Sequence, residues 1–370
     1  MKAQATLANW REAPYNRWAF HHVRELIQSA EIANDPRRVR ELAVQPRELE
    51  LAQFLAETQT DGFVVLHRGA LIAEHYAHGM SAASPHILMS VSKSMLGLLF
   101  GSLGIDAERQ VTDFVPEIAN TAYKGATVRH LLDMRSGVAF AEDYLATSGP
   151  IVEYRKATGW NPLGPGEQPS DLHSFYRVLT QRDGPHGGRF HYISTNTDLL
   201  GWVIERATGR RYADLMSEHL WRPVGAAESA YITVDRLGAP RTAGGMCVTA
   251  RDLARVGQWM IEHPTAWVRD IETGGERAAW DAGSFVAYFP GMPMRYRSQW
   301  YILDASGKNE APLVFALGIH GQNLFVDRKN QVVIAKLSSQ AQPLDAARIA
   351  LTMRAVSQLR KCLGRLIGQS

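Results

Sequence analysis

Apolar positions repeat with one period at the two ends of the chain and with another in its middle. Near the N-terminus, residues 63–66 and 71–76 are rich in apolar and β-branched side chains and are joined through Arg68-Gly69, which predicts a β-hairpin. After about residue 280 the strand pattern returns, and strands are predicted at 285–289, 314–317, 323–326 and 331–335. A closing helix is predicted over 346–366 from the apolar positions Ile349, Met353, Val356 and Leu359.

From Ser90 to about residue 270, helical periods dominate. Residues 127–134 and 199–206 each show apolar periodicity that stops near a glycine, and another helix begins at Ala250. Residues 140–191 are rich in Gly, Pro, Tyr and Trp, which indicates long loops over a cleft. The first fifty residues are helical in character but interrupted at Asn34-Asp35-Pro36, and we interpret them as an extension packed on the main body.

Strands at both ends with helices between them predict an α/β (α+β) fold of two lobes. Residues 1–89 and 280–370 would form one lobe, an antiparallel sheet flanked by helices. Residues 90–279 would form an inserted, mostly helical lobe, with the active site between the two.

Composition narrows the classes of function. The 370 residues are 45% hydrophobic and 21% charged, which is ordinary for a globular enzyme, and the net charge of +3 gives no reason to expect a nucleic-acid partner. Cys247 and Cys362 have no metal or redox spacing, which excludes a disulfide framework and fits a reducing compartment. His75 and His78 lack a third ligand at suitable spacing, so no metal is expected.

The N-terminus shows no uninterrupted apolar segment of the signal-peptide type, and no stretch elsewhere is long enough to span a bilayer. We therefore expect a soluble cytoplasmic protein without a membrane partner.

The segment Ser90-Val91-Ser92-Lys93 is the one place where a lysine follows a serine by three residues, and an apolar helical run comes directly after it. Residues three apart lie on one face of a helix, so the hydroxyl and the amine can share a proton, as in acyl-enzyme serine hydrolases. The alternative is a capped, solvated helix start.

A lysine that acts as a base at neutral pH needs a pKa near 7 instead of about 10.4, a change of roughly 4 kcal/mol that requires burial. Tyr192, placed just before the helix that is predicted to begin near Asp198, is a candidate to share a proton with Lys93. Its alternative role is that of a core aromatic residue.

An acyl transfer also needs an oxyanion hole. The Ser90 backbone N–H at a helix N-terminus is one candidate donor, and the strand that holds Gly318-Ile319-His320-Gly321 is a candidate source of the second. His320 as the base of a catalytic triad is disfavoured, because residues 321–323 supply no acid to orient it.

These motifs in this order resemble the class C β-lactamases and the penicillin-recognising serine hydrolase superfamily. Within that group the chain is most similar to the 6-aminohexanoate-dimer hydrolases, the nylon-oligomer amidases. The similarity runs from residues 16–20 through 89–94 to 318–323 and 336–339.

The resemblance implies a two-lobe fold, acylation of Ser90, and Lys93 and Tyr192 as proton handlers. It also implies that the Ile319 N–H is the second oxyanion donor, and that two aromatic residues, Tyr144 and Trp160, lie on loops over the substrate.

The chain departs from the superfamily at three places. Ser194 stands where an Asn is usual, and His320-Gly321-Gln322 stands where Lys-Thr-Gly is usual, which removes the lysine that holds a β-lactam carboxylate. Relatives active on the nylon dimer place an acid near Arg155. In an ungapped alignment Arg155 would repel an ammonium group and prefer an anionic or neutral one, whereas a shifted loop would let Glu153 restore the acid.

The sequence therefore predicts a serine hydrolase that cleaves a small amide or ester through an acyl-Ser90 intermediate, like a 6-aminohexanoate-dimer hydrolase or a carboxylesterase, with no cofactor. The alternatives are β-lactamase or D-Ala-D-Ala peptidase activity, and a non-catalytic protein on the same scaffold that binds penicillin or peptidoglycan fragments. An α/β-hydrolase is disfavoured because the chain has no G-x-S-x-G. A small-molecule substrate is the expected partner, and a homodimer stays open.

Overall fold

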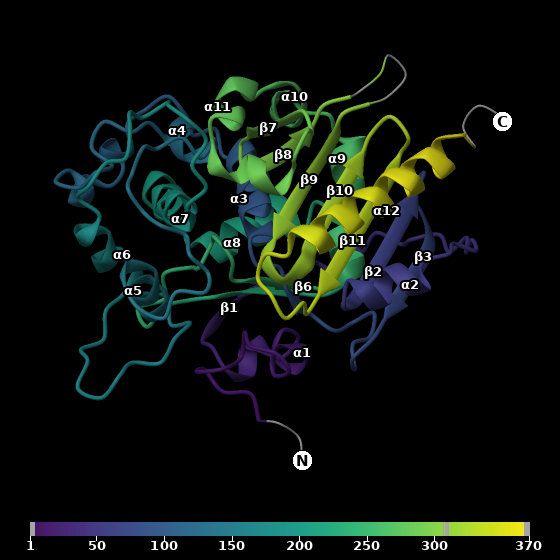
Figure 1. Cartoon of the computed structure of the whole chain (residues 1–370), viewed down its shortest axis with the longest axis horizontal. Coiled ribbons are helices and arrows are strands. Elements are labelled where there is room, and N and C mark those ends of the chain that lie inside the picture. The colour runs from purple at the N-terminus through teal and green to yellow at the C-terminus, as the bar shows by residue number, and fades with distance from the viewer. Residues whose placement is uncertain (1–3, 306, 308–310, 366–370) are drawn as a thin grey trace.

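The computed structural model describes residues 4–305, 307 and 311–365, and its main feature is a seven-stranded antiparallel sheet. The strand order is β3-β2-β11-β10-β9-β8-β7, so an N-terminal hairpin pairs with strands from the C-terminal part of the chain (Figure 1). This confirms the sheet that the sequence predicts from its two ends. The strands are β2 Thr60–His67, β3 Ala70–Tyr76, β7 Met294–Arg297, β8 Trp300–Leu303, β9 Leu313–Gly318, β10 Gln322–Asp327 and β11 Val332–Ser338.

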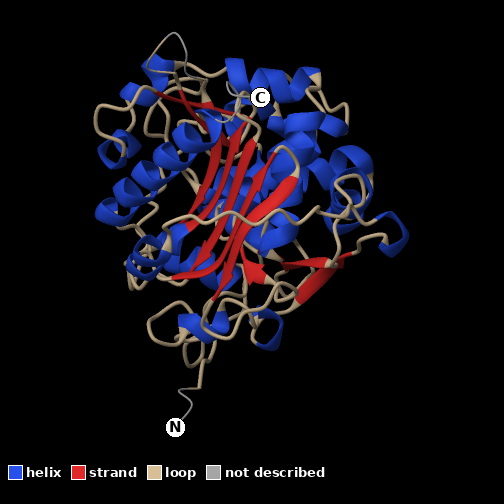
Figure 2. Cartoon of the chain, turned by 90° about the vertical axis from the view of Figure 1, so that its right-hand side faces the viewer, coloured by secondary structure: helices blue, strands red, loops and turns tan. Residues whose placement is uncertain are grey.

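Side chains of the central strands alternate between two cores, one on each face of the sheet, because successive residues of a strand point to opposite faces. On β2, Val64 belongs to the core that includes α3 Val91–Ser102 and α9 Ala250–Glu262, whereas Val65 belongs to the core that includes α12 Ala346–Arg365. Helices cover both sides of the sheet (Figure 2). Burial on both faces explains why these strands are almost continuously apolar in the sequence.

A second, four-stranded sheet of order β1-β5-β6-β4 was not predicted. It joins β1 Ser29–Ile32 to β5 Ala230–Thr233, and β6 Met246–Val248 to β4 His86–Ile87. Strand β4 has only two residues, too few for a sequence pattern, yet it ends just before Ser90. The small sheet therefore anchors the chain where α3 begins.

The remaining helices are mostly short. Helices α4 to α7 lie to one side of the large sheet, on the left in Figure 1. None of the helices in the described ranges combines the length and the apolarity that crossing a bilayer requires. They are α1 Asn16–Ala19, α2 Ala52–Glu57, α4 Val128–Leu132, α5 Pro150–Ala157, α6 Leu172–Phe175, α7 Ser194–Thr208, α8 Tyr212–Met216, α10 Ala266–Thr273 and α11 Arg277–Asp281.

Two predictions of secondary structure are wrong. The expected strand at 285–289 is a 3-10 helix, Ser284–Tyr288, none of whose residues is fully buried, and it covers an aromatic cluster instead of joining a sheet. Residues 4–50 form the four-residue α1, two 3-10 turns, β1 and an isolated β-bridge at Val44. Pro14, Pro36 and Pro46 each lack the N–H that helix continuation needs.

The predicted boundaries at 89/90 and 279/280 do not separate two layers. Helices α3 and α9 both lie inside residues 90–279, yet they pack against strands of the large sheet. The physical reason is that the sheet needs cover on its second face, and these two long helices provide it.

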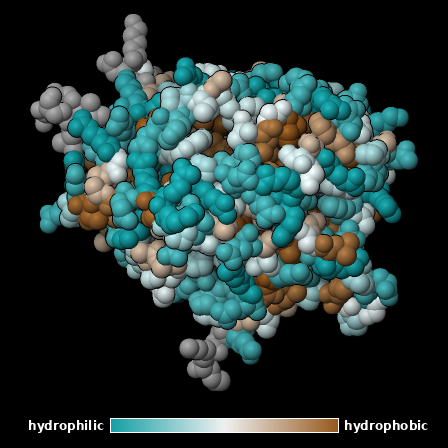
Figure 3. Space-filling view, turned by 180° about the vertical axis from the view of Figure 1, so that it is seen from behind, coloured by the Kyte–Doolittle hydropathy of each residue, from teal (hydrophilic) through white to brown (hydrophobic). Residues whose placement is uncertain are grey.

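Apolar residues on the face shown in Figure 3 form separate groups within a mostly hydrophilic surface. Large apolar side chains with more than a third of their area exposed include Leu145, Val178 and Leu237. Scattered exposure of this kind is normal for a folded protein and carries no argument for a partner.

Candidate active site

Ser90 lies between the end of β4 and the first residue of α3. The preceding residue, Met89, has φ of 46°, a left-handed conformation that is uncommon for a side chain of this kind. Ser90 is 9% exposed, and its hydroxyl does not cap the helix. The hydroxyl is therefore free for other contacts.

Lys93 is buried one turn further along α3, with its ammonium group beside Ser90. Nζ lies 2.9 Å from Ser90 Oγ, 3.0 Å from Ser194 Oγ and 2.7 Å from the Ala243 carbonyl oxygen. Burial and the positive charge of Arg241 lower the pKa of Lys93 to about 7, against the negative charges of Glu142 and Asp198, which raise it. A substantial fraction of this amine is therefore neutral at pH 7 and able to accept a proton.

Tyr192 faces the same hydroxyl from the other side. The Ser90 side chain interacts with the Tyr192 phenol closely enough to lower its pKa, and Lys93 Nζ lies 5.0 Å from the centre of the Tyr192 ring. Phe285 stacks on the ring at 5.1 Å between centroids. Burial raises the pKa of Tyr192 well above its usual value, so the group stays a phenol at neutral pH and Lys93 carries the change of protonation.

Ser194, the first residue of α7, connects Lys93 to a carboxylate that the sequence analysis did not identify. Glu142 accepts a hydrogen bond from Ser194 Oγ at 2.5 Å and another from the Ser194 backbone N–H at 2.7 Å. The negative charge of Glu142 raises the pKa of Lys93, against the effect of burial. Its place in the aromatic loop at 140–144 was the only sequence signal, and Asp143 shares it.

A buried ion pair holds the backbone at Ala243, which in turn contacts Lys93. Arg241 contacts Asp198, and both side chains are buried. Asp198 Oδ1 accepts a hydrogen bond from the Ala243 backbone N–H at 2.7 Å, while the Ala243 carbonyl accepts one from Lys93. The pair therefore positions a backbone segment that contacts the Lys93 amine, and neither residue was predicted to do so.

The end of β9 lies against the backbone of Ser90. A Cβ atom added at Gly318 would lie 2.7 Å from the Leu88 carbonyl oxygen and 3.0 Å from Ser90 N, so only glycine fits here. Ile319 follows directly, at the start of a short turn that is nearly buried. The structure thus brings the backbones of both predicted oxyanion donors together.

His320 is not brought to Ser90. Its Nδ1 lies 2.7 Å from the Gln340 carbonyl oxygen, and burial lowers its pKa to about 4, so the ring is neutral. Its φ of 61° turns the chain after Ile319. The residue supports this turn.

The two predicted aromatic residues differ in their placement. Tyr144 is half-buried and lies close to Glu142. Trp160 is 4% exposed, donates from Nε1 to Thr233 Oγ1 at 3.0 Å, and packs against Gly244, where a Cβ would lie 3.0 Å from the indole. Trp160 is thus a buried residue packed on Gly244, and its contact with substrate stays a prediction.

Arg155 is hydrogen-bonded to the backbone of the loop at residues 143–146. Its guanidinium donates to the carbonyl oxygens of Asp143, Tyr144 and Ala146, at 3.1, 3.0 and 3.2 Å. It also lines a cleft of about 580 Å³ together with Ile319. The side chain of Glu153 is 59% exposed and pairs with Lys156 at 3.0 Å, so it does not bring an acid into the cleft.

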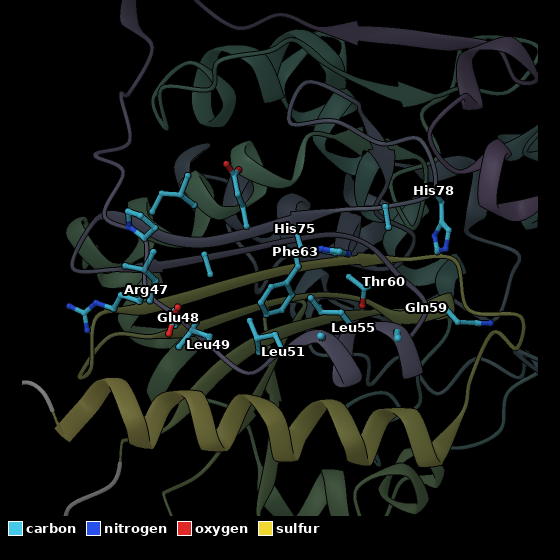
Figure 4. A pocket seen from close by; sticks show the side chains of 18 of the residues that line it. Arg47, Glu48, Leu49, Leu51, Leu55, Gln59, Thr60, Phe63, His75 and His78 are labelled. Carbon is cyan, nitrogen blue, oxygen red and sulfur yellow. The ribbon is translucent and has the colours of Figure 1, made fainter.

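A larger groove of about 860 Å³ lies elsewhere, between residues 44–59 and the hairpin β2–β3 (Figure 4). Phe63 and Leu55 line it, with His75 and His78 also facing it. Neither Ser90, Lys93 and Tyr192 nor Tyr144 and Ile319 line this groove, so it is separate from the site described above.

An antiparallel sheet covered by helices on both faces, with a Ser–Lys pair at the start of one of those helices, is the architecture of β-lactamase-like serine hydrolases. The chain belongs to the beta-lactamase family, whose sequence profile matches residues 50–358.

Individual relatives show which members of this family the chain resembles. The chain is 38% identical to the 6-aminohexanoate-dimer hydrolase of Paenarthrobacter ureafaciens, over 92% of this chain and 89% of that protein. A candidate 6-aminohexanoate-dimer hydrolase from Bacillus anthracis superposes with a TM-score of 0.86 at 26% identity, covering 99% of this chain and 98% of the other. The resemblance inferred from the sequence is thereby confirmed.

A D-stereospecific amidohydrolase from Streptomyces has the same fold. Its TM-score is 0.60 at 18% identity, covering 82% of this chain and 98% of the other.

Proposed function

We propose that this chain hydrolyses small amides and esters through an acyl-enzyme on Ser90. The observation that carries the proposal is the distance of 2.9 Å between Lys93 Nζ and Ser90 Oγ in a buried site where the lysine has a pKa of about 7. A neutral amine at hydrogen-bond distance from a hydroxyl is what activates a serine nucleophile.

In the proposed reaction, Lys93 takes the proton of Ser90 as Oγ attacks the carbonyl carbon. The oxyanion that forms is stabilised by the backbone N–H groups of Ser90 and Ile319. Tyr192 gives its proton to the departing nitrogen or oxygen, and the ammonium of Lys93 restores that proton, so the charges balance. Water then attacks the acyl ester, and the same groups carry the protons in the reverse direction.

A small amide is the first choice of substrate, because the relative with 38% identity is a 6-aminohexanoate-dimer hydrolase. Ester cleavage follows from the same chemistry, since an alkoxide or phenolate leaves more readily than an amine. The residues that we place in the mechanism need neither a metal nor an organic cofactor. We place the substrate between the sheet and the helical lobe, where α3 meets Tyr192.

Two rival functions have less support. A β-lactamase or D-Ala-D-Ala peptidase would need a cation for the substrate carboxylate at residues 320–322, and the chain has His-Gly-Gln there. A non-catalytic binding protein would have no need for the complete set of Ser90, Lys93 and Tyr192.

We also propose the cytoplasm as the location, because Cys247 and Cys362 are both free thiols.

Fluorophosphonate labelling tests the proposal. Wild type should become covalently labelled and Ser90→Ala should not. Ser102→Ala, at the other end of the same helix, is the matched control and should label like wild type. Equal labelling of Ser90→Ala and wild type would remove Ser90 from its role.

A further inference from the structure

The cleft of about 580 Å³ that adjoins the oxyanion backbone is lined from two directions by arginines. Arg11 comes from the N-terminal segment and Arg155 from α5, while Ile319 and Tyr144 link the cleft to the site. Ile319 follows the glycine that packs on Ser90 N. Ser90, Lys93 and Tyr192 do not line the cleft themselves, so it adjoins the site at Ile319, and a substrate bound to Ser90 would reach it past that residue.

Neither arginine has an acidic partner within the described part of the chain. Arg155 uses its guanidinium on three loop carbonyls. Arg11 donates one hydrogen bond, to Asn161 Oδ1, and its Nε is buried without any partner. The nearby Arg241 differs, because Asp198 neutralises it.

Arg11 is held in place for contact with a ligand. Its guanidinium carbon lies 5.5 Å from the centre of the Trp10 ring and 5.9 Å from that of Trp160, and both rings are buried. These contacts fix the orientation of the planar group before anything binds, which reduces the entropy lost on binding.

The two guanidinium groups destabilise one another. Burial and the positive charges of Arg155 and Arg241 lower the pKa of Arg11 to about 9, against the opposing charge of Glu12, an exposed residue that lines the same cleft. Glu142 acts on Arg155 but is already hydrogen-bonded to Ser194. An anion in the cleft would relieve this repulsion.

We propose that Arg11, aided by the positive charge of Arg155, binds a carboxylate of the substrate, so that the preferred substrates are amides or esters that carry an anionic group. This rests on the proposed hydrolase function. A guanidinium can bind a carboxylate through two parallel hydrogen bonds, and Arg11 lines the cleft without an acidic partner. The carboxylate could belong to the acyl part or to the leaving group, and both use this chemistry.

Two pairs of esters test the proposal and separate these sources. Mono-p-nitrophenyl glutarate against p-nitrophenyl butyrate places the charge on the acyl part, and 4-acetoxybenzoate against phenyl acetate places it on the leaving group. Arg11→Gln should lower kcat/KM for the charged member of one pair by about tenfold or more, equivalent to about 1.4 kcal/mol. The loss should lie mainly in KM, and the neutral member should change by less than about twofold.

Two further variants serve as controls. Arg11→Lys keeps the charge and should restore part of the preference. Arg37→Gln removes a charge from a side chain that is 91% exposed and should behave like wild type. An equal loss for charged and neutral esters in Arg11→Gln would show a structural role and overturn the proposal.

A measurement on wild type alone keeps the test valid if Arg11→Gln fails to fold. Glutarate should inhibit the hydrolysis of p-nitrophenyl butyrate competitively, and neutral glutaramide should not. Equal inhibition by both, or by neither, would contradict a carboxylate site while leaving the hydrolase function intact. Full labelling of Ser90→Ala would instead contradict the hydrolase function.

Discussion

Glu142 holds Ser194 through two hydrogen bonds, 2.5 Å to its hydroxyl and 2.7 Å to its backbone N–H. Because the same hydroxyl oxygen accepts a hydrogen bond from Lys93 at 3.0 Å, a single side chain separates a carboxylate from the amine that we propose as the base. The protonation of Lys93 is therefore set by opposing influences, since burial and Arg241 favour the neutral amine and Glu142 favours the ammonium.

Replacement of Glu142 by Gln should move the acidic limb of the pH profile of kcat/KM to lower pH. Glu142 raises the pKa of Lys93, so its loss lowers that pKa and leaves the amine neutral in more acidic solution. Ester hydrolysis measured across the acid range checks this. Glu153→Gln, on the exposed side of α5, should not shift the limb. A limb that stays in place or moves upward in Glu142→Gln would contradict the role given to this carboxylate.

Wild type should lose activity as the pH falls through about 7, because Lys93 becomes protonated near that pH and no longer accepts the Ser90 proton. Lys93→Arg keeps a cation that cannot act as a base, and kcat should fall by about 10²-fold to 10⁴-fold. Steady-state ester hydrolysis measures both effects. Lys124→Arg, an exposed position, is the control. Activity in Lys93→Arg near that of wild type would show that another group takes the proton.

The Ser90–Lys93 pair could be predicted from the sequence, because it depends only on the spacing of two residues within one helix. Ser90 and Lys93 are one helical turn apart, so their proximity follows from helix geometry alone. Glu142 and Arg241 reach the site from distant segments, and their spacing carries no such information. For Glu142 the sequence could not decide between two adjacent acids, because tertiary packing determines which of them points inward.

The errors in the fold also have physical causes. The apolar run at 285–289 has no period, and its side chains cover the aromatic residues around Tyr192 from outside the sheet. Strand β7 was missed although residues 294–297 alternate between buried and half-buried positions, because arginines occupy the outer face of this edge strand. Arg155 lines the cleft, as the alignment suggested. Its hydrogen bonds to loop carbonyl oxygens depend on tertiary contacts, which an alignment does not show.

Gly318→Ala should lower kcat about a hundredfold or more. The new methyl group would lie 3.0 Å from Ser90 N and 2.7 Å from the Leu88 oxygen, both rigid backbone atoms, so the end of β9 must move away from Ser90. That movement displaces one of the two oxyanion donors, whose loss typically has an effect of this size. Kinetics should be compared with Gly104→Ala, where a Cβ would meet no atom of the described residues within 4 Å. An unchanged kcat in Gly318→Ala would mean that Ile319 N–H does not serve the oxyanion.

Arg241→Gln should destabilise the fold and move the acidic limb of the pH profile upward. Loss of the guanidinium leaves the buried Asp198 carboxylate without its counter-ion, which typically costs about 3–5 kcal/mol in the free energy of unfolding. It also removes the positive charge that lowers the pKa of Lys93, so a higher pH is needed to free the amine.

Urea denaturation and the pH profile of kcat/KM measure the two effects on Arg241→Gln separately. The matched control is Arg189→Gln, whose ion pair with Asp183 has side chains that are 47% and 51% exposed, so its loss should cost less than about 1 kcal/mol. Glu142→Gln and Arg241→Gln together test the sign of each charge's effect on the pKa of Lys93, because they should shift the acidic limb in opposite directions. If both variants shift the limb in the same direction, the pKa of Lys93 is not governed by these two charges.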